Sequence, residues 1–209
     1  MTNTGVVFRP AMAADAAVAV PLIHSSGPAA FDYVFGVPGH GDAQAFLHHA
    51  FVDGAGEFGW RNHVAGELDG TVVAVGAGFG GASKWPFTGA AARQILEHYG
   101  WQHAGAVIVR GLRVEAVIPP PTGKLHYLAH LAVAPAWRGH GIGQALVAHL
   151  LALAPPDRSG FVLDVAATNP AAQRLYARLG FEVTGERHST LANSQCQVPD
   201  HRRMRRPPD

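Results

Sequence analysis

The chain contains very little cysteine and lysine, little net charge and no long apolar run. A single cysteine, Cys196, among 209 residues excludes an intrachain disulfide framework and a cysteine-based zinc site. The 16 basic and 15 acidic side chains leave a net charge of +1, which gives no electrostatic case for binding nucleic acid or an anionic membrane surface. No apolar stretch approaches the ~20 residues that span a bilayer.

The rest of the composition is typical of an ordinary globular protein. The first residues lack a basic segment followed by an apolar one, so we expect no secretory signal and a cytoplasmic protein. A chain of 209 residues suits one domain and buries about 70% of its unfolded surface. The 13 histidines form no H-x-H or H-E-x-x-H pattern, so we expect no bound metal.

One glycine-rich turn is the most informative segment. A strand-like apolar run, residues 125–133, leads into a short turn at Pro135, and Gly139, Gly141 and Gly143 then precede a helix-like run. The first N–H groups of a helix have no intrahelical partner, and with the positive end of the helix dipole they attract anions. Glycine has no Cβ to keep a ligand away. The turn therefore predicts a site for an anion such as a pyrophosphate.

Two common phosphate motifs do not fit this turn. A P-loop requires Gly-Lys-Ser/Thr, whereas the residues after Gly141 read Ile-Gly-Gln. The dinucleotide fingerprint G-x-G-x-x-G, begun at Gly139, requires glycine where the chain has Gln144, and it normally lies in the first βαβ unit. The pattern that fits is R-x-x-G-x-G, formed by Arg138, Gly141 and Gly143.

A second motif follows further along the chain. Residues 169–181 read N-P-A-A-Q-R-L-Y-A-R-L-G-F, between strand-like runs at 161–166 and 181–184. The two motifs, in this order, resemble those of the GCN5-related N-acetyltransferase (GNAT) superfamily. In that family R/Q-x-x-G-x-G/A follows a strand ending in Val-x-Pro, and N-x-x-A-x-x-x-Y-x-x-x-G-F forms a later helix. The close resemblance covers roughly residues 125–190.

The resemblance implies an α/β (α+β) protein with the GNAT fold, a mixed, splayed β-sheet of about six to seven strands flanked by helices. It implies one acetyltransferase domain over residues 1–209, with an acceptor-side half at 1–120 and an acetyl-CoA-binding half at 121–209. It also implies acetyl-CoA as co-substrate and an amine as acceptor.

The resemblance also assigns roles to residues. The strand at 125–133 would pair its free backbone groups with the pantetheine arm, as in β-strand addition. Tyr176 would be the general acid, since a phenol of pKa about 10 can protonate a leaving thiolate; alternatively it only packs a helix on the sheet. Asn169 would contact the coenzyme arm, and it fits equally well as a helix N-cap before Pro170. The residues expected to bind acetyl-CoA are Leu131, Ala132, Val133, Arg138, Gly139, His140, Gly141, Ile142, Gly143, Gln144 and Asn169.

The sequence leaves the general base and the acceptor site open. His126 and His130 on the coenzyme strand, Glu57 and Glu115 upstream, and an ordered water are alternatives for the base. In a regular strand the two histidines would share one face about 13 Å apart, too far to chelate one metal. The acidic candidates for receiving a cationic amine are Asp32, Asp42, Asp53 and Glu57. The aromatic segment 31–36 could border the acceptor groove, or simply pack a helix.

The remaining segments predict several short elements. Residues 6–10 are typical of an edge strand, and Asp69-Gly70 predicts a hairpin between two strands. Segment 104–117 is ambiguous between strand, helix and irregular insert. The basic tail 201–208 fits either a last edge strand or a frayed end.

Together these features favour an N-acetyltransferase that moves the acetyl group of acetyl-CoA to a primary amine of a small molecule or peptide by direct attack. The alternatives are a transferase that uses another acyl-CoA or acceptor, and a non-catalytic acyl-CoA-binding sensor. We expect no nucleic-acid partner and no membrane partner, and an edge strand leaves a homodimer open.

Overall fold

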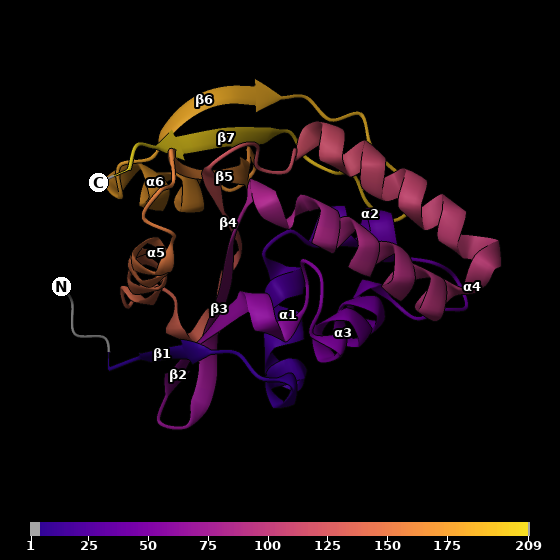
Figure 1. Ribbon diagram of the computed structural model, residues 1–209, viewed down its shortest axis with the longest axis horizontal. Coiled ribbons are helices and arrows are strands. Elements are labelled where there is room, and N and C mark those ends of the chain that lie inside the picture. The colour runs from indigo at the N-terminus through magenta and orange to yellow at the C-terminus, as the bar shows by residue number, and fades with distance from the viewer. Residues whose placement is uncertain (1–4, 209) are drawn as a thin grey trace.

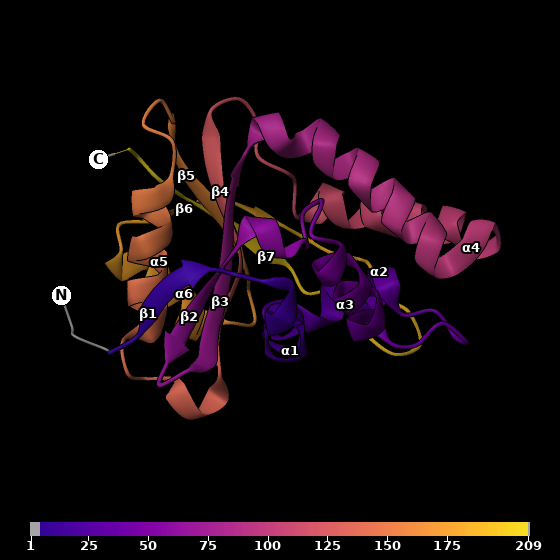
Figure 2. The same cartoon turned by 60° about the horizontal axis from the view of Figure 1, so that its bottom comes forward.

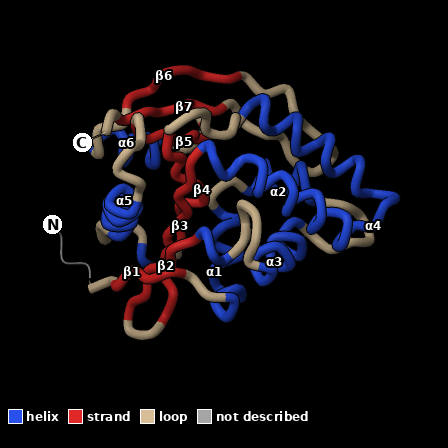
Figure 3. Tube along the Cα trace, viewed as in Figure 1, coloured by secondary structure: helices blue, strands red, loops and turns tan. Residues whose placement is uncertain are grey.

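The computed structural model describes residues 5–208, which form a seven-stranded sheet with helices on both faces (Figures 1 and 3). The strand order is β1-β2-β3-β4-β5-β7-β6, and only the β4–β5 pair is parallel. The strands are β1 (Val7–Pro10), β2 (His63–Leu68), β3 (Thr71–Gly80), β4 (Leu125–Val133), β5 (Gly160–Ala166), β6 (Glu182–Arg187) and β7 (His201–Arg206). The helices are α1 (Ala16–Ser25), α2 (Pro28–Phe35), α3 (Ala43–Asp53), α4 (Lys84–Val117), α5 (Ile142–Leu153) and α6 (Pro170–Arg178).

The helices cover the two faces unequally. Helices α5 and α6 lie against one face, whereas α1, α2, α3 and α4 lie on the other (Figure 2). Each layer has its own apolar core, since Leu146 and Leu150 of α5 pack with Leu128 of β4, while Phe46 and Phe51 of α3 pack with the α1 side. None of the helices within residues 5–208 combines the length and hydropathy that a membrane span requires.

The first half of the sheet is antiparallel. Strand β1 pairs along β2 at the edge of the sheet, as its sequence predicted. At the β2–β3 connection Asp69 has φ 49° and Gly70 has φ 77°, the two positive values that a two-residue hairpin turn requires. The predicted Asp-Gly hairpin is therefore confirmed.

Strands β4 and β5 separate soon after they meet. They pair only at Leu125, His126 and Tyr127 of β4, opposite residues 160–162 of β5. Beyond this point β5 pairs on its other side with β7, and within residues 5–208 no strand covers the facing edge of β4 at 128–133. The expected splay of a mixed sheet is confirmed.

A bulge in β4 corrects one expectation. His130 has φ 55°, and the β3–β4 register shifts between Val75 and Ala77. An extra residue in one strand reverses the side-chain alternation beyond it. His126 and His130 therefore lie on opposite faces rather than sharing one: His126 packs against Phe161 beneath α5, and His130 packs on the α1 side.

Segment 84–117 is a kinked helix. Gly100, with φ 65° and ψ 169°, breaks α4 into two arms, and the chain reverses between them in a helical hairpin that extends away from the sheet (Figure 1). The β-branched run at 107–109 belongs to the second arm, so the strand interpretation of this run was wrong. Val107 is fully buried, and its packing outweighs its local preference for a strand.

The basic C-terminal segment also differs from the expectation. Strand β7 is internal, with β5 on one side and β6 on the other. Its Arg203 donates to both carboxylate oxygens of Asp164, at 3.2 and 2.8 Å, and to the carbonyl of Pro119. The Asp164 side chain is 98% buried, so Arg203 lies here because it pairs with that carboxylate and not because water solvates it. The segment is therefore neither an edge strand nor a frayed end.

Candidate active site

The glycine turn connects β4 to α5 at the end of the sheet where β4 has lost its partner. After Val133 the chain makes one turn of 3-10 helix at Pro135–Trp137 and enters α5 through Gly141. Gly139 has φ 83° and Gly141 has φ 81°, values that side-chain-bearing residues rarely adopt. A Cβ on Gly139 would meet no atom within 4 Å, so the space beside the turn is open.

The backbone of this turn presents a run of free donors. Among residues 5–208, no group accepts a hydrogen bond from the N–H groups of residues 139–144; the next one, that of Ala145, donates to the carbonyl of Gly141 at 3.0 Å. Free N–H groups at a helix start carry partial positive charge, which the α5 dipole strengthens. The turn has the geometry of an anion cradle.

Arg138 fastens the turn to the strand. Its Nε donates to the carbonyl of Val133 at 3.0 Å, and His140 donates from Nδ1 to the carbonyl of Arg138 at 3.0 Å. The Val133 carbonyl is therefore already occupied. Ala132 faces Val75 of β3, since Ala134 two residues on donates to the carbonyl of Val73, so the N–H of Val133 and the backbone of Leu131 remain toward the uncovered edge. The turn follows this open strand edge directly in the chain.

Tyr176 points from α6 into the core beneath α5. It is 8% exposed and lies edge-on to Phe181 at 6.3 Å. Burial raises the pKa of Tyr176 to about 12, so the phenol stays protonated at neutral pH. No hydrogen bond of its hydroxyl is present among residues 5–208, and the hydroxyl is not one of the fully buried polar atoms that lack a partner, so it is accessible at the edge of this core. The hydroxyl is thus available to a ligand.

Asn169 is the N-cap of α6. Its Oδ1 accepts a hydrogen bond from the N–H of Ala172 at 3.1 Å, and Pro170 occupies the first helical position. This confirms the capping interpretation, and the cap fixes where α6 begins and hence where Tyr176 lies.

A histidine pair occupies the opposite face of β4. His130 Nδ1 lies 3.0 Å from Nε2 of His63 on β2, and His63 Nδ1 lies 2.9 Å from the carbonyl of Gly59. His130 Nε2 faces Glu57 Oε1 at 3.5 Å. Sequence reasoning proposed His130 and Glu57 separately and missed His63, because no local pattern indicates that β2 and the β4 bulge meet.

Most acidic candidates for the acceptor site already have partners. Asp32 pairs with His24 at 2.8 Å, Asp42 caps α3, and Asp53 pairs with Arg93 at 2.8 Å. Arg93 and Gln94 together hold the pKa of Asp53 at about 2.

Glu57 is the fourth acidic candidate, and its neighbour is His130 at 3.5 Å. It lines a cavity of about 100 Å³ with Glu115, Lys84 and the aromatic rings of Phe58 and Phe79. Burial, and then the neighbouring Glu57 charge, raise the pKa of Glu115. The charges of Glu57 and Glu115 outnumber that of Lys84 in this cavity, and the remaining negative charge favours a cation.

The sequence comparison decides the family. Residues 40–181, well over half of the 209, match the family described as "Acetyltransferase (GNAT) family". The chain belongs to the GNAT family. Membership makes the protein an acyltransferase enzyme with acetyl-CoA as its donor, and it confirms the resemblance carried by the two motifs. A comparison with the curated proteins gives no match.

Solved GNAT structures share this fold. An N-acetyltransferase from Staphylococcus aureus Mu50 superposes with a TM-score of 0.64 at 15% identity, over 95% of this chain and 99% of that one. A GCN5-related N-acetyltransferase from Kribbella flavida gives 0.57 at 20% identity, over 97% and 98%. The putative acetyltransferase yncA from Salmonella typhimurium, solved with its cofactor acetyl-CoA, gives 0.55 at 17% identity, over 98% and 94%. At these identities the likeness establishes the fold.

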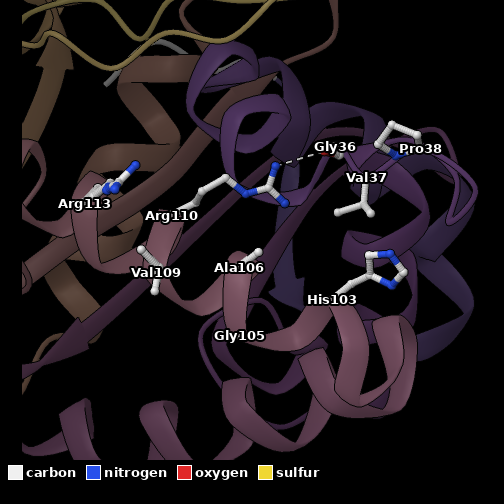
Figure 4. A pocket seen from close by; sticks show the side chains of 9 residues that line it. All are labelled: Gly36, Val37, Pro38, His103, Gly105, Ala106, Val109, Arg110 and Arg113. Atoms are coloured by element: carbon white, nitrogen blue, oxygen red, sulfur yellow. Dashed lines mark hydrogen bonds between the residues drawn. The ribbon is translucent and has the colours of Figure 1, made fainter.

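A larger cavity of about 480 Å³ lies elsewhere on this GNAT enzyme, between the loop after α2 and the second arm of α4 (Figure 4). Arg110 crosses it and donates to the carbonyl of Gly36 at 3.1 Å, while Arg113 and His103 also line it. It shares no lining residue with the glycine turn, β4 or α6. Within residues 5–208 no group of histidine, cysteine, aspartate and glutamate side chains is arranged to hold a metal ion.

Proposed function

We propose that this enzyme transfers the acetyl group of acetyl-CoA to a primary amine of a small molecule or peptide by direct attack of the amine on the thioester. The observation that carries the proposal is the run of free N–H groups at residues 139–144 beside the uncovered edge of β4. Free N–H groups bind a pyrophosphate, and an uncovered strand edge binds the amide groups of a pantetheine arm. The whole chain would act as one domain, with acceptor residues within 1–120 and acetyl-CoA residues within 121–209.

The glycine turn would hold the pyrophosphate. The N–H groups of Gly139, His140, Gly141, Ile142, Gly143 and Gln144 would donate to its oxygens, and Arg138 would add positive charge. Gly143 tolerates a Cβ in the folded chain, since the nearest atom would be Leu175 Cδ2 at 3.4 Å. Packing therefore does not demand glycine at this position, which supports a role in ligand approach.

The strand would align the pantetheine arm, using the backbone of Leu131 and the N–H of Val133 for hydrogen bonds, with Ala132 between them contacting the arm. Asn169 caps α6 with Oδ1 and would contact the arm through its NH₂ group. The protein forms no covalent intermediate in direct attack, so alignment of donor and acceptor provides much of the rate enhancement.

Tyr176 would protonate the departing thiolate. Its raised pKa of about 12 makes it a weaker acid than a free phenol, but it guarantees that the proton is present at neutral pH. The hydroxyl has no protein partner among residues 5–208, which supports this role because it is free to donate to the thiolate sulfur.

Tyr176→Phe tests the proposal against a sensor that binds acyl-CoA without catalysis. We expect kcat for thiol release, followed with a panel of primary amines, to fall about 10²- to 10⁴-fold, the usual contribution of general acid catalysis. Acetyl-CoA affinity, measured by calorimetry, should stay unchanged, and the Tm should not fall, because the hydroxyl has no protein partner to lose. Unchanged turnover would remove Tyr176 from the mechanism.

A further inference from the structure

His130 has an unusual backbone conformation in a buried position. Its φ of 55° is rare for a residue with a side chain, and such conformations persist where the surroundings hold them, often at functional sites. The side chain is only 7% exposed and lies between the rings of Phe31 and Phe58, at centroid distances of 5.9 and 5.2 Å. The bulge turns this imidazole to the face that carries the acceptor-side helices.

The hydrogen bonds around His130 fix its tautomer. The Gly59 carbonyl can only accept, so Nδ1 of His63 carries the proton in that 2.9 Å bond. Complete burial lowers the pKa of His63 to about 3, so His63 is neutral and its Nε2 is a bare acceptor. The 3.0 Å contact therefore requires His130 Nδ1 to donate. Neutral His130 then has its lone pair on Nε2.

That lone pair faces the carboxylate of Glu57 at 3.5 Å. A proton arriving at Nε2 creates an imidazolium that donates to His63 on one side and pairs with Glu57 on the other. In this imidazolium both ring nitrogens have partners. Glu57 is 42% exposed and lines the cavity that also contains Glu115, so its carboxylate lies between that cavity and His130.

Resting on the proposed function, we propose that Nε2 of His130, oriented by His63 and Glu57, takes the proton from the acceptor ammonium, and that the acceptor is a cationic primary amine entering beside Glu57. His130 lies on the acceptor face and Tyr176 on the coenzyme face. Beyond Tyr127 β4 no longer pairs with β5, so a ligand along that edge would border both faces of the sheet. His130 would be the catalytic base, with His63 and Glu57 as positioning residues.

The protons balance in this scheme. The acceptor ammonium gives one proton to His130 Nε2, and the neutral amine forms a C–N bond to the thioester carbon while the C–S bond breaks. The sulfur takes the proton of Tyr176, and the second proton of the reacting nitrogen restores the Tyr176 hydroxyl. His130 returns its proton to solvent, so one proton is released for each amide formed.

The tautomer can be tested without an acceptor. In protein labelled with ¹⁵N-histidine, NMR at pH 8 should show His130 with a protonated Nδ1 and a bare Nε2, assigned by comparison with His130→Asn. Asparagine tolerates the positive φ at this position and cannot take up a proton. A neutral His130 protonated on Nε2 would overturn the proposal, because no lone pair would then face the acceptor.

Kinetics test the role itself, with butylamine, phenethylamine and putrescine as acceptors. In His130→Asn we expect kcat/KM to fall about 10²- to 10⁴-fold and the acid limb of its pH profile to disappear, with acetyl-CoA affinity unchanged. His126→Asn, on the same strand but the other face, is the matched control and should keep the acid limb. Thermal melts of both variants establish that they fold.

Glu57→Gln gives a second test through a side chain that is 42% exposed. Glutamine cannot form an ion pair with the imidazolium of His130, so the acid limb should move to lower pH, with a lower plateau. A wild-type acid limb in both His130→Asn and Glu57→Gln would overturn the assignment while leaving acetyl transfer intact. A wild-type protein that fails to bind acetyl-CoA would overturn the proposed function and this inference together.

Discussion

Gly139→Ala isolates the contribution of the glycine turn to acetyl-CoA binding. Gly139 has φ 83°, and a Cβ there would meet no protein atom within 4 Å. The substitution therefore disturbs the folded protein only through its backbone conformation, at about 1–2 kcal/mol. In a domain of this size that lowers the Tm by roughly 2–8 °C.

Gly70→Ala is the matched control. Gly70 has φ 77° in the β2–β3 turn, and a Cβ there would also meet nothing within 4 Å. Both variants should lose about the same folding stability. A difference in acetyl-CoA affinity between them therefore comes from the contact between the turn and the ligand. In Gly139→Ala the methyl group occupies the side of the turn that a pyrophosphate would approach.

The expected difference in affinity follows from the hydrogen bonds lost. One charge-assisted bond contributes about 1.5–3 kcal/mol, which is roughly 10- to 150-fold in Kd. Calorimetry with acetyl-CoA should therefore show weaker binding by that factor in Gly139→Ala and wild-type binding in Gly70→Ala. Equal affinities in the two variants would refute the assignment of the pyrophosphate to this turn.

Three further predictions concern pH and stability. Because the pKa of Tyr176 is raised to about 12, kcat should show no basic limb from this acid below about pH 11, and a limb near pH 9 removed by Tyr176→Phe would contradict its burial. The pKa of His63 falls from 6.5 unfolded to about 3 folded, so its share of stability is complete above pH 6.5 and is lost as the pH falls toward 3. Urea unfolding should show wild type losing about 2 kcal/mol more than His63→Gln between pH 7.5 and 5. Asp164→Asn should lower the Tm by roughly 6–12 °C, because it leaves the guanidinium of Arg203 without its anionic partner. Asp157→Asn, which removes the exposed ion pair with Lys124, should change the Tm little.

Sequence reasoning located the coenzyme half of the fold well because its signals are local. The strand at 125–133, the glycine turn and the Asn-Pro start of α6 each depend on residues close in the chain, and the structure forms all three. Strand β7 was harder to predict. Its run of arginines resembles a solvated tail, and only the buried Asp164, distant in sequence, explains why it is internal.

The acceptor side was least predictable from sequence, because its geometry depends on one extra residue in β4. A regular strand places His126 and His130 on one face, and the bulge places them on opposite faces. The contact between His130 and His63 joins residues 67 positions apart and leaves no spacing to detect. The helical hairpin of α4 likewise depends on the non-helical backbone conformation of Gly100. Glycine is permissive in any context, so its presence in the sequence does not predict a kink.

A crystal structure of the protein with acetyl-CoA tests the central claim most directly. We predict pyrophosphate oxygens within hydrogen-bond distance of the N–H groups of residues 139–144, the pantetheine arm along β4 at 131–133, and the sulfur beside the Tyr176 hydroxyl. Phosphates bound instead in the basic cavity of Arg110 and Arg113, with the glycine turn empty, would contradict it.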